Sequence, residues 1–521
     1  MLATRSRTKL NPPQSSSITS PIGGLNARDS LAAMAPEDAV ILDNFFPTPT
    51  TVDLRNGSVN WKTAFPAAVE SLLPYTSAIV AKLFAASGTA FYDATTQGAI
   101  GAPVVTGLSN ARWQSANMGT PGGQFMLNVN GTDKLRGYDG TNWWADGDGS
   151  HDITGVNTAN CIHINVFKNR VWLVEKNTFH AWYLPLQSVS GAAQLFDLSS
   201  LFKLGGFLMA MATWTIDNAA GVNEYAVFIS SEGEIAFYEG IDPSTAATWI
   251  LDGMFRVGRP VGRRCFTKVG ADVIVITSDG AFPLSKALLT DRSQLQDAIT
   301  AKIIKLINAD IQAYNANFGW EITLFPLGNK LIINVPQTPG VTQYQYVMNT
   351  ITGAWCRFLD WNANCFCVLQ DVLYYGGNLT TPNSGFVAKA DLGNSDNGNF
   401  IFGEVQTAFQ YFGAPGRLKR WTMARPVFLT AGAIGPSIRM DVDFETVTPT
   451  STGTFSATGG TPWDTDLWDT FPWGSNTSIK KNWQAVGGNG YAGALHMKLK
   501  NNATSLSWMS VDYVFEYGQI L

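Results

Sequence analysis

The residue types that most often carry out chemistry are scarce in this sequence. Five cysteines and four histidines occur in 521 residues, with no CxxC pair and no zinc-site spacing. An odd, sparse set of cysteines is typical of buried free thiols in a reducing cytoplasm. No Walker loop, nucleophile elbow, HExxH or dinucleotide-binding motif is present. We therefore expect no enzyme activity, no metal and no cofactor. The cysteines and histidines are Cys161, Cys265, Cys356, Cys365, Cys367, His151, His163, His180 and His496.

Acidic residues form three patterns that invite a chemical interpretation. Ser278-Asp279-Gly280 approaches the Asp box of sialidase-type propellers, but it lacks the full spacing and is better explained as a hairpin turn. Asp464 and Asp466 are a pair of carboxylates that invites interpretation as an acid and a base, but no His or Arg lies nearby. Residues 146–149, Asp-Gly-Asp-Gly, resemble a calcium loop without its twelfth-position Glu. A structural role is favoured for all three.

Two basic clusters are conspicuous because only 14% of the residues are charged, against about 25% in an ordinary soluble domain. Either cluster could contact nucleic acid or an acidic partner subunit. The alternative is a solvated face or salt bridges between subunits. Neither cluster has the interleaved aromatics of a single-strand binder. The first contains Arg256, Arg259, Arg263, Arg264 and Lys268, and the second contains Arg417, Lys419, Arg420 and Arg425.

The overall composition predicts a large β-rich protein. Hydrophobic residues make up 45% of the chain, which excludes wholesale disorder. The chain contains 50 Gly, 24 Pro and 17 Trp, and its net charge of −5 excludes a generally basic nucleic-acid binder. A surface with few charges suits a protein that functions inside an assembly. We also expect neither a signal peptide nor a membrane-spanning helix.

A recurring strand pair predicts the fold. Between residues 70 and 399 a short apolar strand is followed by a Gly-centred turn and an aromatic-rich strand, as in 82–92, 125–138 and 273–282. Another expected turn is Gly376-Gly377, after the strand at 372–375. Successive strand starts near residues 83, 125, 171, 226, 273, 331 and 372 suggest the period of a four-stranded propeller blade. We predict an all-β chain with a β-propeller of six or seven blades. The alternative is a β-sandwich made of unrelated hairpins.

Four further segments flank or interrupt this pattern. Residues 1–20 are expected to form a flexible arm, and 21–69 an extended entry segment with one short helix beginning near Pro36. Apolar residues at three- and four-residue spacing predict an inserted amphipathic helix at about 291–315. Such a helix either caps the core or packs on a neighbouring subunit. Residues 400–521 are predicted to form a separate β domain. Its Trp-rich loop, with Trp463, Trp468 and Trp473, is a candidate interface.

Several segments resemble the nozzle class of tail proteins of short-tailed phages, also called tail tubular protein B or DNA-stabilisation protein. The resemblance begins with Ile22-Gly23-Gly24-Leu25-Asn26-Ala27-Arg28-Asp29 and continues with 39–47, AVILDNFFP, and Arg55-Asn56-Gly57. Downstream, 412–420, FGAPGRLKR, and the Trp-Asp loop are similar to the C-terminal part of the same class. The resemblance spans nearly the whole chain, and its motifs are structural signatures without a catalytic anchor.

This resemblance implies a structural protein of the virion. It implies a homohexameric tube below the portal–adaptor ring that retains packaged double-stranded DNA and passes it during ejection, with tail fibres or spikes attached outside and no membrane insertion of its own. The protein would be made in the host bacterial cytoplasm. Under this hypothesis, the basic clusters contact partner subunits or grip the DNA end. One alternative is a carbohydrate-binding or glycan-cleaving propeller of a receptor-binding tail component. Another is a head–tail joining or baseplate protein of a long-tailed phage.

Overall fold

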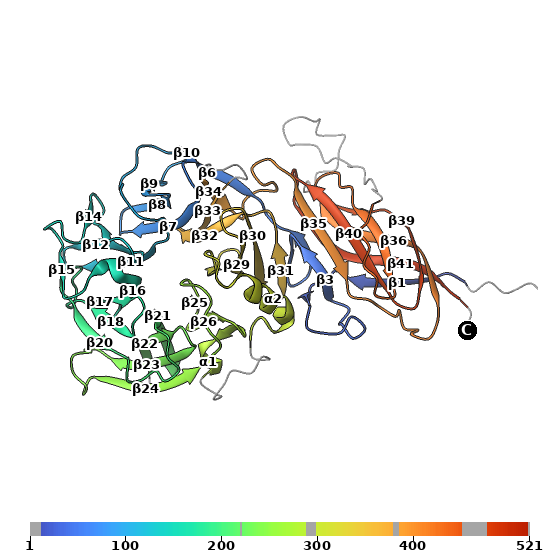
Figure 1. Ribbon diagram of the computed structural model, residues 1–521. Coiled ribbons are helices and arrows are strands. Elements are labelled where there is room, and N and C mark those ends of the chain that lie inside the picture. The colour runs from blue at the N-terminus through green and yellow to red at the C-terminus, as the bar shows by residue number, and fades with distance from the viewer. Residues whose placement is uncertain (1–11, 219–220, 288–297, 379–384, 451–476, 519–521) are drawn as a thin grey trace, which may run out of the picture. The chain divides into compact units, whose positions relative to one another are not determined.

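The computed structural model describes residues 12–218, 221–287, 298–378, 385–450 and 477–518, and nearly all of its regular structure is β-strand (Figure 1). The chain divides into two compact units. Unit 1 comprises Met1–Ser58, Val347–Phe358 and Leu392–Leu521, and unit 2 comprises Val59–Tyr346 and Leu359–Asp391. The all-β prediction is confirmed. No helix within the described residues is long and apolar enough to cross a membrane.

Unit 2 is built from small antiparallel sheets that follow one another along the chain. The first four sheets contain β7 (Val69–Thr76), β8 (Ala81–Ser87) and β9 (Ala90–Asp93); β11 (Gln114–Thr120), β12 (Gly123–Val129), β13 (Arg136–Tyr138) and β14 (Trp143–Ala145); β16 (Cys161–Phe167), β17 (Arg170–Glu175), β18 (His180–Tyr183) and β20 (Gln194–Asp197); and β21 (Leu208–Asn218), β22 (Gly221–Ser230), β23 (Glu234–Gly240) and β24 (Trp249–Arg256).

Two more sheets, and between them a run of three strands from a nine-stranded sheet, complete the series in unit 2. They contain β25 (Phe266–Val269), β26 (Asp272–Thr277) and β27 (Gly280–Pro283); β28 (Glu321–Phe325), β29 (Lys330–Thr338) and β30 (Thr342–Asn349); and β32 (Ala363–Leu369), β33 (Val372–Asn378), β34 (Gly385–Ala390), β6 (Ser58–Phe65) and β10 (Gly98–Ala99). The last sheet therefore combines three strands from late in the chain with two strands, β6 and β10, from its N-terminal part. A minor sheet pairs β15 (Ile153–Thr154) with β19 (Gly191–Ala192).

The sequence of β17 explains why these sheets stack face to face. Successive side chains of a strand point to opposite faces, so alternate residues of Val171-Trp172-Leu173-Val174 belong to different faces. Val171 and Leu173 pack in the core shared with the β11–β14 sheet, and Trp172 and Val174 pack in the core shared with the β21–β24 sheet. Both faces are buried, which favours a continuous apolar run rather than an alternating pattern.

Unit 1 contains two larger sheets and draws its strands from both ends of the chain. One has the order β38-β36-β41-β5-β4, with β1 added to β41 and β39 to β36, and the other contains the path β31-β3-β35-β40-β37, with β2 added to β3. The strands are β1 (Gln14–Thr19), β2 (Gly24–Leu25), β3 (Asp38–Asp43), β4 (Phe45–Pro47), β5 (Val52–Leu54), β31 (Trp355–Phe358), β35 (Ile401–Thr407), β36 (Lys419–Thr430), β37 (Ser437–Val442), β38 (Ser478–Lys481), β39 (Gln484–Gly490), β40 (Gly493–Asn501) and β41 (Leu506–Tyr517).

The N-terminal segments differ from their predicted structure. Residues 14–19, expected within a flexible arm, form β1, which pairs antiparallel with β41 from Ser510 to Phe515. The short helix expected near Pro36 is absent, because residues 36–37 form a turn and Asp38 already begins β3. The predicted separate domain at 400–521 is also incorrect as a division. Its strands β35 and β41 pair directly with β3 and β1 from the N-terminal region.

Two predictions within unit 2 also needed correction. The helical segment is shorter than expected. A 3₁₀ turn at Ala301–Ile303 leads into α2 (Ile304–Tyr314), and residues 291–297 lie outside the described part of the chain. A second short helix, α1 (Leu284–Ala287), follows β27, and a 3₁₀ turn covers Thr158–Asn160. Gly376 and Gly377, expected to form a turn, lie inside β33 instead, because a side chain at 376 would collide with Val69 and Cys365.

Candidate functional site

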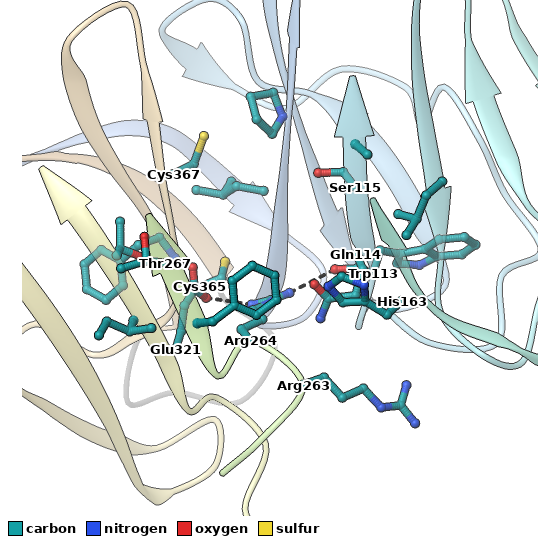
Figure 2. A pocket seen from close by; sticks show the side chains of 18 of the residues that line it. Trp113, Gln114, Ser115, His163, Arg263, Arg264, Thr267, Glu321, Cys365 and Cys367 are labelled. Atoms are coloured by element: carbon teal, nitrogen blue, oxygen red, sulfur yellow. Dashed lines mark hydrogen bonds and ion pairs between the residues drawn. The ribbon is translucent and has the colours of Figure 1, made fainter. Parts of the chain in front are cut away.

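Unit 2 contains a cavity of about 620 Å³. It is lined mainly by the first strand of several successive sheets, namely β7, β11, β16, β25, β28 and β32 (Figure 2). These strands also contact one another in order. β7 contacts β11 and β32, β16 contacts β11 and β21, β21 contacts β26, and β28 contacts both β25 and β32. The cavity thus lies where the first strands of different sheets meet.

Arg264 links four of these sheets from one side of the cavity. Its guanidinium forms an ion pair with Glu321 at 2.9 Å and donates hydrogen bonds to Ser71 Oγ at 2.7 Å and to the backbone oxygens of Glu70 and Trp113, each at 3.1 Å. Dashed lines in Figure 2 mark contacts of this group. Because the side chains of Arg264 and Glu321 are only 13% and 10% exposed, both charges are largely buried and must be paired. Arg264 therefore holds the cavity wall together.

Several polar side chains of the cavity have no hydrogen-bond partner within the described part of the protein. They include Ser115, Thr267 and Gln114, which are half-buried. His163 is buried, and its Nδ1 accepts a hydrogen bond of 3.4 Å from the backbone nitrogen of Met211. Burial, together with the nearby charge of Arg263, lowers the pKa of His163 to about 4. His163 is therefore neutral at pH 7, and because Nδ1 accepts a hydrogen bond, its proton lies on Nε2.

The first basic cluster does not act as one surface. Arg264 is committed to the internal contacts just described, whereas Arg256 is exposed at the end of β24. Arg259 forms an exposed ion pair with Glu232, and Arg263 donates a hydrogen bond to the backbone oxygen of Asn130 at 3.2 Å. Lys268 lies in β25, and burial lowers the pKa of its ammonium group. The sequence alone could not separate the internal arginine from its exposed neighbours.

The second basic cluster is divided in the same way. Lys419 is fully buried, and its ammonium donates to the backbone oxygens of Ala414, Arg417 and Tyr491. Arg425 pairs with Asp512 at 2.7 Å. Arg417 lies over the ring of Tyr517 with its guanidinium carbon 5.2 Å from the ring centroid, and Arg420 is exposed. Lys419 therefore fixes a loop, and only the exposed arginines remain available to a partner.

The other sequence candidates have structural roles or lie outside the described residues. All five cysteines are buried and free, as predicted. Ser278-Asp279 forms the turn between β26 and β27, and Gly280 begins β27. Asp148 accepts hydrogen bonds from Ser150 and from the backbone, which lowers its pKa to about 2. Within the described residues no group of three or more His, Cys, Asp or Glu is placed to hold a metal. Residues 463–473, with Asp464, Asp466 and the three candidate tryptophans, lie outside the described chain.

The first motif of the resemblance, residues 22–29, packs closely against Trp355 and against β3. Gly24 has a φ of +81°, and a Cβ there would lie 2.6 Å from the backbone oxygen of Trp355. A Cβ on Gly23 would lie 2.5 Å from Asp38 Oδ1. Asn26 donates to Asp29 and Asp38 and accepts from the backbone nitrogens of residues 28 and 29. The glycines are therefore required by close approach, and Asn26 ties the motif to β3.

The remaining N-terminal motifs form two bidentate ionic contacts in unit 1, of which the Arg55 pair is the more buried. Arg55, whose side chain is fully buried, binds both carboxylate oxygens of Asp396 at 3.1 and 2.6 Å and donates from Nε to Asn44 Oδ1 at 2.8 Å. Arg357 binds both oxygens of Asp43 at 2.8 and 2.6 Å. Both pairs have the bidentate geometry that planar guanidinium and carboxylate groups favour. These partners were not predicted, because no local spacing relates residues so far apart in sequence.

Comparison with known proteins gives distant structural similarities. No protein-family model matches the chain, and no curated protein sequence matches it. PorZ, an essential bacterial surface component of the type-IX secretion system of Porphyromonas gingivalis, matches at 12% identity and a TM-score of 0.36 over 71% of this chain and 44% of PorZ. Raptor of Chaetomium thermophilum matches at 8% identity and a TM-score of 0.37 over 66% of this chain and 29% of Raptor. The SapL1 lectin, solved with alpha methyl fucoside, matches at 15% identity and a TM-score of 0.29 over 57% of this chain and 96% of the lectin.

The chain therefore spans less than half the length of PorZ and of Raptor. At these TM-scores the similarities identify neither a family nor an activity.

Proposed function

We propose that unit 2 is a seven-bladed β-propeller. Seven successive groups of strands support this proposal, of which six are separate sheets and one, β28 to β30, is part of a nine-stranded sheet. Contacts that connect these groups in order, from β7 through β28 and β32 back to β7, also support it. The last sheet adds β6, from the N-terminal part, to the three antiparallel strands β32, β33 and β34. Joining strands from both ends of the propeller segment in one blade would close the ring without a free edge.

We further propose that the chain is a structural protein of a phage tail, of the nozzle class. The observation that carries this proposal is the common location of the resembling N-terminal motifs. Residues 22–29, 39–47 and 55–57 belong to unit 1, where close backbone approach requires Gly24 and a bidentate ion pair engages Arg55. The motifs thus describe one structural unit, as expected of a family defined by its assembly rather than by catalysis.

In this proposal six copies form a tube below the portal–adaptor ring. The tube retains packaged double-stranded DNA, passes it during ejection and carries tail fibres or spikes outside, in a virion assembled in the host bacterial cytoplasm. A low density of free positive charge would help passage, because each phosphate contact slows a moving DNA strand. Contacts with DNA or a neighbouring subunit are assigned to the exposed Arg256, Arg259 and Arg263 and to Arg417 and Arg420, whereas Arg264 and Lys419 are engaged internally.

The test is the mass of the purified full chain by light scattering, alone and with the portal–adaptor complex of the same phage. We expect six copies to bind the adaptor ring. A monomer or trimer that ignores the adaptor would overturn the nozzle proposal. A second experiment replaces Arg256, Arg259 and Arg263 with Ser and measures genome retention. Unchanged retention would exclude these arginines as the DNA contact and leave the assembly proposal to the mass measurement.

A further inference from the structure

We propose that the cavity of unit 2 binds a small neutral polyhydroxylated molecule, such as a hexose. The cavity, of about 620 Å³, falls within the range of about 300–1,000 Å³ that is usual for small-molecule sites. Figure 2 shows Ser115, His163 and Thr267, which come from three different strands, among the side chains that line it. This inference concerns unit 2 alone and does not depend on the nozzle proposal.

The charges of the cavity favour a neutral ligand. Arg264 and Glu321 neutralise each other through their ion pair, and His163 is uncharged at pH 7. Glu321 is further occupied, because its Oε1 lies 3.3 Å from both the Thr323 hydroxyl and the backbone nitrogen of Phe366. Figure 2 shows the guanidinium of Arg263 pointing away from Arg264 and His163. Arg263 also lines the cavity, but its side chain is exposed. Beside His163 and the Arg264–Glu321 pair a charged ligand would therefore find no free counter-charge, which is costly in a partly desolvated site.

The unused hydrogen-bonding groups favour hydroxyls over other neutral groups. Ser115 and Thr267 each offer a hydroxyl that donates and accepts, the Gln114 amide does both through separate atoms, and His163 Nε2 donates. Sugar hydroxyls are also donors and acceptors at once, so they can satisfy all four groups in one ligand. A purely apolar ligand would desolvate these groups without replacing their water contacts.

The site is held rigid before any ligand arrives. Arg264 fixes β7 through Ser71, the segment before β11 through Trp113, and β28 through Glu321. His163 is oriented by the backbone nitrogen of Met211 in β21. Groups already held in place lose little conformational entropy on binding, which favours recognition by a few hydrogen bonds.

Saturation-transfer NMR on the full chain tests this proposal, with glucose, galactose, mannose and N-acetylglucosamine as probes and calorimetry for affinity. We expect at least one sugar to bind. Thr267→Val keeps the shape of the side chain but removes its hydroxyl, so affinity should fall about twofold to tenfold. The matched control is Thr63→Val, at a half-buried position of β6 that does not line the cavity. It should leave affinity unchanged.

Three outcomes would overturn the proposal. The first is that none of the four sugars shows a saturation-transfer signal. The second is that neither Thr267→Val nor Ser115→Ala alters the affinity for a sugar that binds. The third is that glucuronate binds more tightly than glucose. The last would mean that the site selects an anion. Circular dichroism melting checks that each variant is folded, and Ser115→Ala decides if Thr267→Val does not fold. The light-scattering test of ring assembly is independent, so the two proposals can fail separately.

Discussion

The two units use buried charge differently. Unit 1 assembles three separate stretches of chain, and bidentate pairs such as Arg55–Asp396 and Arg357–Asp43 join those stretches. Unit 2 is made of consecutive hairpins whose apolar faces stack, and Arg264 adds a polar contact among sheets that already pack together. A unit assembled from distant pieces thus relies on directional contacts, whereas a unit made of local pieces relies on apolar burial.

The largest expected effect tests the directional contacts of unit 1. Arg55→Ala removes the bidentate ion pair with Asp396 and the hydrogen bond to the Asn44 amide oxygen, although the Ser58 hydroxyl still donates to Asp396. We expect a loss of about 3–5 kcal/mol in the free energy of unfolding of unit 1, the usual cost of breaking a buried ion pair. Urea unfolding combined with hydrogen exchange in β3, β5 and β35 measures the loss for this unit.

The matched control is Arg28→Ala, which removes a guanidinium from a half-exposed pair with Asp29 in the same unit. It should cost less than about 1 kcal/mol, because solvent screens such pairs. Equal losses for Arg55→Ala and Arg28→Ala would contradict the conclusion that buried ionic contacts hold unit 1 together.

A smaller effect is expected for the corresponding arginine of unit 2. Arg264→Ala should cost about 2–4 kcal/mol, because Glu321 loses its ion pair but keeps its contacts with Thr323 and the backbone of Phe366. Arg259→Ala, in the same basic cluster but exposed, should change stability by less than about 1 kcal/mol. Thermal unfolding of both variants gives the comparison. Similar values would mean that the cluster acts as one surface after all.

The next prediction tests the apolar packing of unit 2 at a glycine. A Cβ on Gly376 would lie 2.5 Å from Val69 Cγ1 and 2.7 Å from Cys365 Sγ, so Gly376→Ala should cost about 1–3 kcal/mol through overpacking. Gly101→Ala meets no atom within 4 Å and should cost less than about 0.5 kcal/mol. Urea unfolding distinguishes the two. A harmless Gly376→Ala would restore the original interpretation of this glycine as part of a turn.

The sequence predicted unit 2 better than unit 1, because unit 2 is made of local pieces of chain and unit 1 of distant ones. A strand such as β26, with the run Val273-Ile274-Val275-Ile276 and Asp279-Gly280 after it, carries its strand and turn signals within ten residues. The pairing of β1 with β41 has no local signal, because the two strands lie at opposite ends of the chain. Polar residues such as those of β1 therefore appeared to belong to a flexible arm.

The candidate site was predicted only in part. The basic residues were identified, but the pairing of Arg264 with Glu321 depends on which sheets become neighbours, and no periodicity in the sequence encodes that. His163 and Thr267 gave no signal, because single polar residues in apolar strands do not differ visibly from solvent-facing ones. The motif glycines were recognised as a signature, but the close approach of Trp355 that requires Gly24 is a tertiary contact.

The smallest expected effect concerns the other buried ionic cluster of unit 1. His496 is 1% exposed, with Nδ1 2.9 Å from Asp441 and Nε2 2.9 Å from Glu404. Both nitrogens face carboxylates, so the ring must donate twice and carry a positive charge. Gln406 in β35, Arg439 in β37 and Lys498 in β40 also contact these carboxylates. Burial opposes the charge, but the hydrogen bonds that the ring donates to Asp441 and Glu404 outweigh it and raise the pKa of His496.

A raised pKa in the folded state fixes the direction in which the stability of unit 1 changes with pH. The stabilisation is complete below the unfolded pKa of about 6.5 and is lost as pH rises through the higher folded pKa of His496. The slope in that interval is at most about 1.4 kcal/mol per pH unit. Burial also opposes the charge of Glu404, but the hydrogen bonds that it accepts from His496 and Lys498 outweigh burial and lower its pKa. The stabilisation that Glu404 contributes is therefore lost only as pH falls through that lowered pKa.

Urea unfolding of unit 1 between pH 6 and 9 therefore tests whether its buried charges respond to pH. We expect stability to fall with rising pH in the wild type. In His496→Gln it should be lower at pH 6 and change less with pH, because an amide cannot supply the titrating charge. The control is His180→Gln in unit 2, a partly exposed histidine beside Glu175, which should leave the pH dependence of unit 1 unchanged. A wild-type profile as flat as that of His496→Gln would mean that the ring is neutral, and that unit 1 depends on its arginine pairs alone.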